Sequence, residues 1–192
     1  MMIKYPYPPL SDGVILLRSW TERDLSAVEQ GGKDPYIVTT TSVPASYTLE
    51  AGQEWLERQR RHTVEGTGLP FCIADSQTDK ALGFIGLWLR NYELGRVHFG
   101  YWAIPQARGR GVTSASLRLL STWAFENLDV VRLELWVELW NVASQRVAER
   151  ASFLREGVLH SYAEVDGVYR DVFMYARIAD PGRKKADPGR RE

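Results

Sequence analysis

Hydrophobic and polar residues alternate along much of the chain with the period of β-strands. The stretch Val130–Trp140 shows this most clearly, because Val131, Leu133, Leu135, Val137 and Leu139 face one way and charged or Trp residues face the other. Short apolar or alternating runs predict the remaining strands, at Val14–Arg18, Leu69–Asp75, Leu82–Arg90, Arg96–Ile104, Ser161–Val165 and Val168–Ile178. Asp166-Gly167 joins the last two and favours a tight type I′ turn.

Helical spacing appears between these strands. Leu117, Leu120, Ala124 and Leu128 form one apolar stripe, which predicts a buried helix over Val112–Asn127. Thr21 followed by Asp24 is a helix-start signal. Further helices are expected over Leu49 to about Glu65 and Val142 to about Ala151, whereas residues 31–47, rich in Gly, Pro and hydroxyls, are expected to be mostly loop.

This order predicts an α+β fold with a single mixed, mostly antiparallel sheet flanked by helices. The length of 192 residues suits one domain. We place that domain at residues 14–178, after an N-terminal extension at 1–13. The tail at 179–192 repeats Ala-Asp-Pro-Gly-Arg and has almost no apolar content, so it is expected to be disordered.

Composition narrows the classes of function. The formal net charge is zero, so no overall basic field favours nucleic acid. Cys72 is the only cysteine, and His62, His98 and His160 lack paired ligand spacing, so no metal site is expected. The first nine residues contain prolines where a signal peptide needs an apolar core, and no apolar run is long enough for a membrane span. A cytoplasmic protein without membrane contact, monomeric or homodimeric, is expected.

The segment Arg108-Gly-Arg-Gly-Val-Thr113, between a strand and a buried helix, is the main candidate for chemistry. A helix start offers free N–H groups and a dipole that favour a pyrophosphate. Gly109 and Gly111 allow close approach, and Arg108 and Arg110 can add charge-assisted bonds. A glycine-rich turn without a ligand fits the local string equally well. The dinucleotide-binding pattern fails because position 114 is Ser, and no Gly-Lys-Ser/Thr follows for an ATP-binding P-loop.

At this point the sequence resembles the GCN5-related N-acetyltransferase (GNAT) superfamily, and within it the RimJ/RimL-like branch that acetylates ribosomal-protein N-termini. The family signature Gln/Arg-x-x-Gly-x-Gly/Ala is matched by Arg108-x-x-Gly111-x-Thr113, except that Thr113 replaces the usual small last residue. The other matches follow in family order from about Ile15 to Tyr175: Leu17-Arg18 with Asp24, Gly83-Phe-Ile-Gly86, Gly100-Tyr-Trp102, Asn141-x-x-Ser144, Ala148–Phe153, Glu156-Gly157, Asp171 and Tyr175.

The resemblance implies acetyl-CoA as co-substrate and a splay between the strands at 96–104 and 130–140, where the pantetheine arm would lie. The residues implied to hold acetyl-CoA are Trp102, Ala103, Ile104, Arg108, Gly109, Arg110, Gly111, Val112, Thr113, Ser114 and Asn141. The acceptor amine would attack the thioester directly, and Ser144 would give a proton to the leaving thiolate. A Ser that bonds only backbone in the first turn of a helix is the alternative for Ser144.

The base is left open by the sequence. His98, Glu134 and Glu138 are comparable candidates, and a water relay without a single base also fits. Two further positions and one segment depart from the family pattern: Ser152 replaces a Gly, Ile104 replaces a frequent polar residue, and residues 31–47 match nothing in the family.

Three functions are consistent with these features. The first is an N-acetyltransferase acting on a primary amine, either a peptide N-terminus or a small molecule. The second is a non-catalytic acyl-CoA-binding sensor, which Asn141 and Ser144 disfavour. The third is a protein interaction domain without a ligand, which the glycines and arginines of the cradle disfavour. The sequence does not identify the acceptor.

Overall fold

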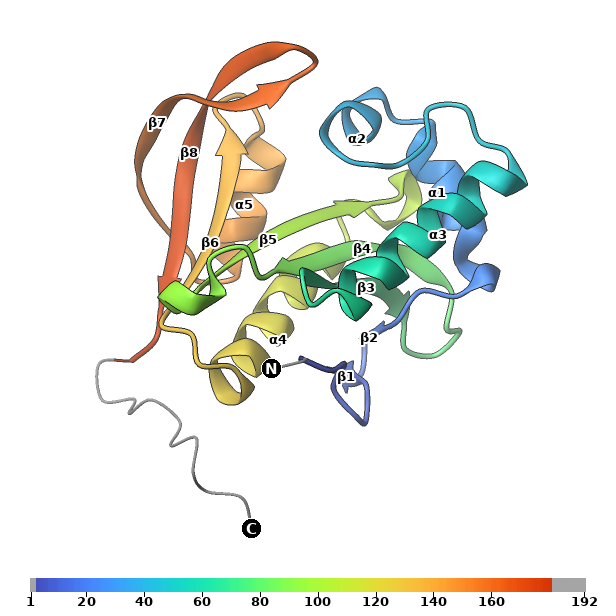
Figure 1. Cartoon of the computed structure of the whole chain (residues 1–192), viewed down its shortest axis with the longest axis horizontal. Helices are drawn as coiled ribbons and strands as arrows, with labels where there is room; N and C mark the ends of the chain where they lie inside the picture. Colours follow the sequence, from blue (N-terminus) through green and yellow to red (C-terminus); the bar gives the residue numbers. More distant parts are fainter. Residues whose placement is uncertain (1–2, 181–192) are drawn as a thin grey trace.

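The alternating stretches of the chain pair into one eight-stranded sheet in the order β1-β2-β3-β4-β5-β6-β8-β7 (Figure 1). A computed structural model describes residues 3–180. The strands are β1 (Leu10–Ser11), β2 (Ile15–Arg18), β3 (Gly68–Asp75), β4 (Ala81–Trp88), β5 (Arg96–Ala103), β6 (Arg132–Glu138), β7 (Leu154–Val165) and β8 (Val168–Ile178). All neighbours are antiparallel except β5 and β6, so the mixed, mostly antiparallel sheet is confirmed.

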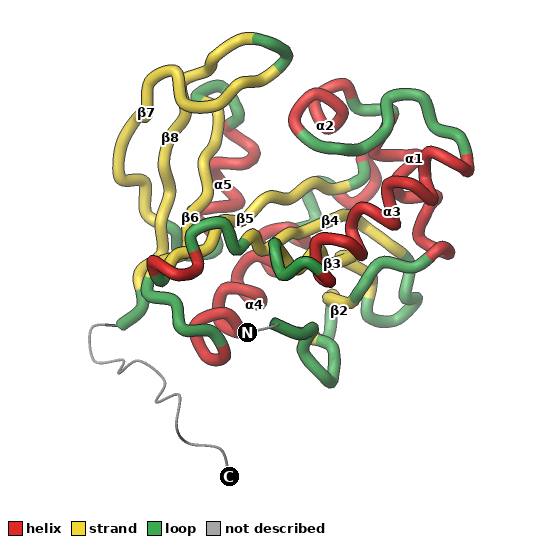
Figure 2. The backbone as a smooth tube through the Cα atoms, in the orientation of Figure 1, coloured by secondary structure: helices red, strands yellow, loops and turns green. Residues whose placement is uncertain are grey.

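Helices cover both faces of the sheet (Figure 2). They are α1 (Leu25–Gly32), α2 (Pro35–Thr40), α3 (Leu49–Val64), α4 (Val112–Asn127) and α5 (Val142–Arg150), with short 3-10 turns at Glu22–Asp24, Tyr92–Leu94 and Pro105–Ala107. Helices α1 and α3 lie on one face, and α4 and α5 lie on the other (Figure 2). The predicted positions of α3, α4 and α5 are confirmed to within about a residue.

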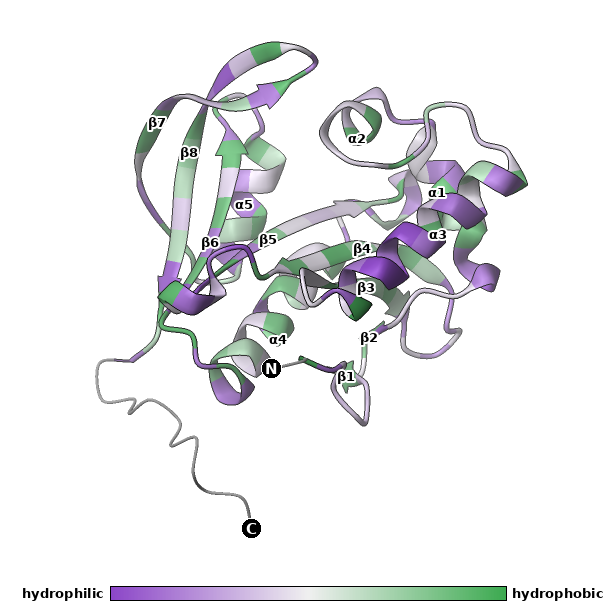
Figure 3. Cartoon of the chain, in the orientation of Figure 1, coloured by the Kyte–Doolittle hydropathy of each residue, from purple (hydrophilic) through white to green (hydrophobic). Residues whose placement is uncertain are grey.

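Amphipathicity explains the placement of α3. Its buried residues are Gly52, Trp55, Leu56 and Gln59, and most of its other residues are charged or polar. The hydropathy colouring shows this helix as largely hydrophilic, with its polar side turned outward (Figure 3). Thr48 caps its N-terminus, since the side chain accepts a hydrogen bond from the Ala51 N–H at 3.0 Å.

The segment 31–47 differs from the expected loop. Helix α1 continues to Gly32, and α2 follows after a turn. Asp34 caps α2 by accepting from the Tyr36 N–H at 2.9 Å, and Pro35 occupies the first helical turn, where its missing N–H costs nothing. The hydroxyls of Thr40 and Thr41 bond back to carbonyls of α2. The Asp-Pro start is therefore the signal that outweighed the loop-forming composition.

Strand β7 is longer than expected. It begins at Leu154 rather than Ser161, and irregular pairing between Leu159 and Ala163 interrupts the alternation on which the sequence prediction relied. The turn at Asp166-Gly167 has φ values of 53° and 71°, as a type I′ turn requires.

Part of the N-terminal segment packs on the domain. Strand β1 pairs with β2, Ile3 is buried, and the Tyr5 hydroxyl donates to the Pro70 carbonyl at 2.7 Å. The expected disordered tail lies outside the described residues from position 181 onward. Within residues 3–180, no helix is both long and apolar enough to cross a membrane.

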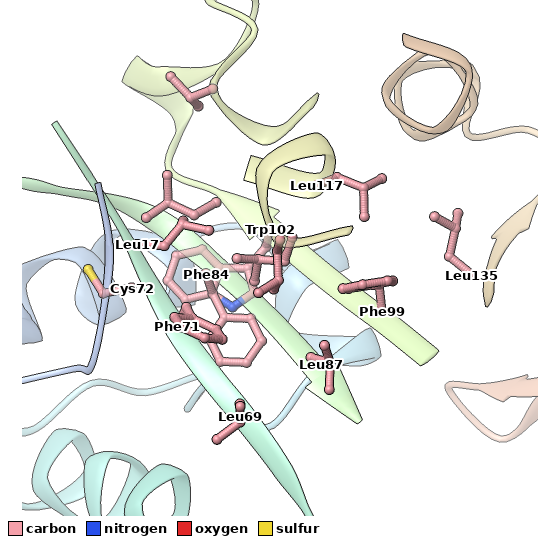
Figure 4. Close-up of a cluster of buried hydrophobic side chains, with 14 of the residues drawn as sticks. Leu17, Leu69, Phe71, Cys72, Phe84, Leu87, Phe99, Trp102, Leu117 and Leu135 are labelled. Atoms are coloured by element: carbon pink, nitrogen blue, oxygen red, sulfur yellow. The ribbon is translucent and has the colours of Figure 1, made fainter. Parts of the chain in front are cut away.

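Aromatic rings dominate the core on the α1 and α3 face. The Phe84 and Trp102 rings stack with centroids 6.1 Å apart (Figure 4). Trp55 meets both rings edge-on. Trp102 also contacts Gly31 of α1, where a Cβ would come within 3.3 Å of the indole. This cluster fixes the end of β5 against α1 and α3, and it thereby positions the edge of β5 that faces β6.

Candidate active site

Strands β5 and β6 are paired only where both begin. Pairing runs from Arg96 with Arg132 to His98 with Glu134 and includes no later residue of the described strands. Beyond that point β5 stays paired with β4 as far as Ala103, while β6 stays paired with β8 as far as Glu138. The predicted splay is therefore confirmed, and the edge of β5 that faces it is left without a partner strand.

A cavity of about 630 Å³ lies at one side of this splay, and we call it the larger cavity. Trp102 and Ala103 of β5, Gly109 and Gly111 of the cradle, and Val112, Thr113 and Ser114 of α4 line it. Gly109 and Gly111 have φ values of +73° and +77°, which residues with a side chain rarely adopt. A Cβ at Gly109 would meet nothing within 4 Å, so the loop faces open space.

The N-terminus of α4 is suited to an anion. Its first turn contains no acidic residue, and its first N–H groups have no partner within the helix. The Ser114 hydroxyl is already used, since it donates to the Gly111 carbonyl at 2.9 Å. The backbone, rather than this hydroxyl, is therefore the main donor at the cradle.

Three arginines line the larger cavity. Arg108 donates through Nε to the Ala103 carbonyl at 3.2 Å and forms an ion pair with Asp34, the capping residue of α2. Burial tends to raise the pKa of Asp34, but the Arg108 guanidinium and the backbone amides of α2 lower it overall. Arg146 and Arg150 lie one helical turn apart on α5 and make no hydrogen bond or ion pair within residues 3–180.

A second cavity of about 230 Å³, which we call the smaller cavity, lies on the face covered by α3. Its walls include Trp55 and Phe84, with Trp88, His98 and Trp136. Burial lowers the pKa of His98 to about 4, against a weaker effect of Glu134, and the ring stacks on Trp136 with centroids 6.2 Å apart. His98 is therefore neutral near pH 7.

The two cavities meet at a small polar cluster. Tyr36, Tyr101, Trp102, Asn141 and Ser144 line both of them. The Tyr101 hydroxyl lies 2.8 Å from Ser144 Oγ and donates to the Ser144 carbonyl at 3.2 Å. Asn141 caps α5, since its Oδ1 accepts from the Ser144 N–H at 3.0 Å. This capping fixes Ser144 in the first turn of α5, at the point where the cavities join.

The three candidate bases occupy different environments. His98 lines the smaller cavity, whereas Glu134 and Glu138 line neither. Glu134 pairs with Arg132, which also binds Glu156. Glu138 is 4% exposed; its Oε2 accepts from the Trp140 indole N–H at 3.0 Å, and its Oε1 has no hydrogen-bond partner among the described residues.

Tyr36 connects Glu138 to the cavities. Its ring meets Trp140 edge-on with centroids 4.9 Å apart, and it lines both cavities. Burial raises the pKa of Tyr36 to about 12; the nearby Asn141 side chain opposes this rise and the Glu138 carboxylate adds to it. The phenol therefore remains protonated at neutral pH, and it lies near the buried Glu138 carboxylate while Tyr36 lines both cavities.

Most residues implied by the sequence line these cavities, but not all of them do. Ile104 is buried in the core and lines neither cavity, and Arg110 also lies outside both linings. Arg110 instead lies near enough to Asp75 for its charge to help lower the pKa of that carboxyl, whose hydrogen bonds to Thr78 and Gln77 contribute more. No cluster of three or more His, Cys, Asp or Glu that could hold a metal occurs in residues 3–180.

Sequence reasoning missed four contributors. Tyr101 has no signal of its own in the sequence beyond its place in Gly100-Tyr-Trp102, and Tyr36 lies in the segment expected to be loop. The spacing of four between Arg146 and Arg150 was a usable signal, since it places both on one face of α5.

Comparisons with known proteins agree with this geometry. The model of the acetyltransferase (GNAT) domain matches residues 15–154. The chain is 32% identical to the ribosomal-protein-serine acetyltransferase of Escherichia coli over 131 residues, which cover 65% of this chain and 73% of that protein. It is 25% identical to an N-acetyltransferase of Bacillus licheniformis over 164 residues, 85% of this chain and 92% of that protein. The solved structure of Mycobacterium smegmatis RimJ in complex with CoA-disulfide is similar with a TM-score of 0.77 at 23% identity, covering 92% of this chain and 88% of that chain.

Proposed function

The chain belongs to the GNAT family of acetyltransferases, acyltransferases that use acetyl-CoA, and from that premise we propose that it acetylates a primary amine by direct attack, at a peptide N-terminus or on a small molecule. One observation carries the proposal: the larger and smaller cavities meet at Tyr101 and Ser144, beside the splay of β5 and β6. A donor entering from one side and an acceptor entering from the other would meet there.

The larger cavity fits coenzyme A. The open space at Gly109, the unopposed N-terminus of α4 and the guanidinium groups of Arg108, Arg146 and Arg150 are complementary to a polyanion. The free edge of β5 at Trp102 and Ala103 offers backbone groups to the amides of a pantetheine arm. Bound acetyl-CoA supplies a thioester carbonyl as electrophile and a thiolate as leaving group.

Ser144 and Tyr101 are suited to act together as the acid. Ser144 Oγ faces the junction, and the Tyr101 phenol, 2.8 Å away, can replace the proton that Ser144 gives up. Burial raises the pKa of Tyr101 above its ordinary value, so the phenol stays protonated until a neighbour takes its proton. The proposed acid is therefore the Ser144–Tyr101 pair rather than Ser144 alone, because a serine hydroxyl by itself is a weak acid.

Glu138, reached through Tyr36, is the best supported base. Glu134 is paired with Arg132, and His98 lines only the smaller cavity, outside the cluster shared by both cavities. Glu138 keeps one carboxylate oxygen without a partner among the described residues, and Tyr36 lies near this carboxylate and lines both cavities. The Tyr36 phenol can pass a proton from the amine to this carboxylate.

The test is enzyme-dependent thiol release from acetyl-CoA across a panel of amino acids, peptides, polyamines and aminoglycosides. We expect release to require an acceptor and the product to carry one acetyl group by mass spectrometry. Coenzyme A binding without transfer to any amine of the panel would instead support the non-catalytic acyl-CoA sensor.

A further inference from the structure

Aromatic side chains form one wall of the smaller cavity. The Trp88 indole lies across three glycines on adjacent strands, Gly68, Gly86 and Gly100. A Cβ at Gly68 or Gly86 would come within 2.5 or 2.7 Å of this ring, and one at Gly100 within 3.3 Å. Glycine in the interior of a strand lowers the stability of the sheet. The three glycines under this ring therefore make room for the flat indole while they destabilise the sheet.

Other rings continue this wall around the cavity. Trp88 stacks on Phe84 with centroids 6.3 Å apart, and Trp136 stacks on His98 across the splay. Trp55 of α3 also lines the cavity, and its ring meets Phe84 edge-on. The group bound here is therefore surrounded by π-faces and ring edges, which favour an aromatic or large apolar partner.

The smaller cavity carries no formal charge near neutral pH. No Asp, Glu, Lys or Arg belongs to its lining among the described residues. Burial lowers the pKa of both His62 and His98, so neither ring is protonated. The hydroxyls of Thr40 and Thr41 already donate to backbone carbonyls.

These features disfavour a second ammonium group on the acceptor. Its N–H donors would need acceptors, and burying an unpaired charge is costly. The volume of about 230 Å³ also lies below the roughly 300–1,000 Å³ of pockets that hold drug-sized ligands, so the cavity can enclose one side chain or one ring of an acceptor and not a whole aminoglycoside.

We propose that the acceptor carries an uncharged aromatic or large apolar group next to its primary amine, and that Trp88, Phe84 and Trp136 select this group. The inference rests on the proposed acetyl transfer and specifies its substrate class. The same chemistry occurs in free arylalkylamines and in peptides that begin with an aromatic residue, and the experiment separates these sources.

The experiment compares kcat/KM for five acceptors: phenethylamine, L-phenylalaninamide, a tetrapeptide that begins with Phe, a matched tetrapeptide that begins with Ser, and putrescine. We expect at least one aromatic acceptor to exceed the Ser peptide and putrescine by about tenfold or more. Preference for the Phe peptide over both small amines identifies a peptide source, and the reverse identifies a free amine. Equal or better turnover of the Ser peptide or putrescine overturns the inference while leaving acetyl transfer intact.

Binding provides a readout independent of turnover. Titration calorimetry on the protein saturated with coenzyme A should show tighter binding of L-phenylalaninamide than of L-serinamide. If no acceptor is acetylated, the proposed function fails, and this comparison still decides the inference. Equal affinities, or no binding of either amide, overturn it.

Substitutions at Trp88 and Trp136 test whether these two side chains cause the selectivity. Trp88→Leu and Trp136→Leu keep an apolar side chain but remove the large ring, so kcat/KM for the aromatic acceptor should fall about tenfold relative to the Ser peptide. Trp123→Leu, on α4 and outside both linings, is the matched control and should leave that ratio unchanged. An unchanged ratio in both wall variants would remove these side chains from the selection.

Discussion

The Tyr101 hydroxyl lies 2.8 Å from Ser144 Oγ, within the polar cluster that lines both the larger and the smaller cavity beside the splay. Tyr101 comes from β5 and Ser144 from the first turn of α5, so the contact joins the two sides of the splay. This hydrogen bond links β5 to α5 where β5 and β6 are no longer paired. It is the contact through which the proposed proton transfer would run.

Removal of either hydroxyl should therefore slow turnover. We expect Ser144→Ala and Tyr101→Phe each to lower kcat by about 10²-fold, with the double variant little worse than either, since both act in one proton transfer. Coenzyme A affinity, measured by calorimetry, should change by less than about threefold. Parallel loss of affinity and kcat would instead assign both residues a structural role.

The cradle glycines should be required for their backbone conformation. Gly109→Ala and Gly111→Ala place a Cβ on residues with φ of +73° and +77°, at a strain of about 1–2 kcal/mol each. We expect a lower Tm and at least tenfold weaker binding of coenzyme A, because relaxation of the loop moves the amides away from the ligand.

Gly13→Ala is the matched control for this experiment. Gly13 has a φ of +88°, a Cβ there would meet nothing within 4 Å, and it lies outside both cavity linings. Its Tm should fall similarly while coenzyme A affinity is retained. Loss of affinity in this control as well would show that general strain, rather than cradle geometry, controls binding.

The sequence predicted more of the residues that line the larger cavity than of those that line the smaller cavity. Gly109 and Gly111 sit in a continuous strand-to-helix segment, so local pattern alone placed them at the N-terminus of α4. Tyr36 contacts Trp140, which is 104 positions away, and Trp88 lies against Gly68 and Gly100, which are 20 and 12 positions away on neighbouring strands. Such contacts depend on strand order and register, which hydrophobic periodicity does not encode.

The candidate bases were indistinguishable in sequence for a similar reason. Glu134 and Glu138 lie on one strand four residues apart, and both alternate with the same apolar residues. What separates them is a neighbour supplied by another element: Glu156 completes a network with Arg132 and Glu134, whereas Tyr36 and Trp140 lie beside Glu138. The spacing of residues along the sequence could not identify these partners.

The same contrast yields a paired experiment on the base. Glu138→Gln removes the buried carboxylate and should lower kcat by about 10²-fold, with a small change in Tm. Glu134→Gln weakens the pairing with Arg132, so it should lower Tm while kcat falls by less than about threefold. Activity loss in Glu134→Gln but not in Glu138→Gln would reverse the assignment.

His98 should control stability at acidic pH rather than activity at neutral pH. Its pKa is about 4 in the folded chain and near 6.5 when unfolded, so the unfolded state binds the extra proton first. The stabilisation by neutral His98 is complete above about pH 6.5 and is lost as the pH falls toward 4, to the extent of roughly 3 kcal/mol at most. We expect the free energy of unfolding, measured by urea titration at pH 7, 5.5 and 4.5, to fall less steeply in His98→Gln than in the unmodified chain. Subtraction of the two profiles cancels the carboxylates that titrate in the same range. If His98 were instead the base with a pKa near neutrality, kcat would decline below pH 7 in the unmodified chain, and this decline would disappear in His98→Gln together with most of the activity.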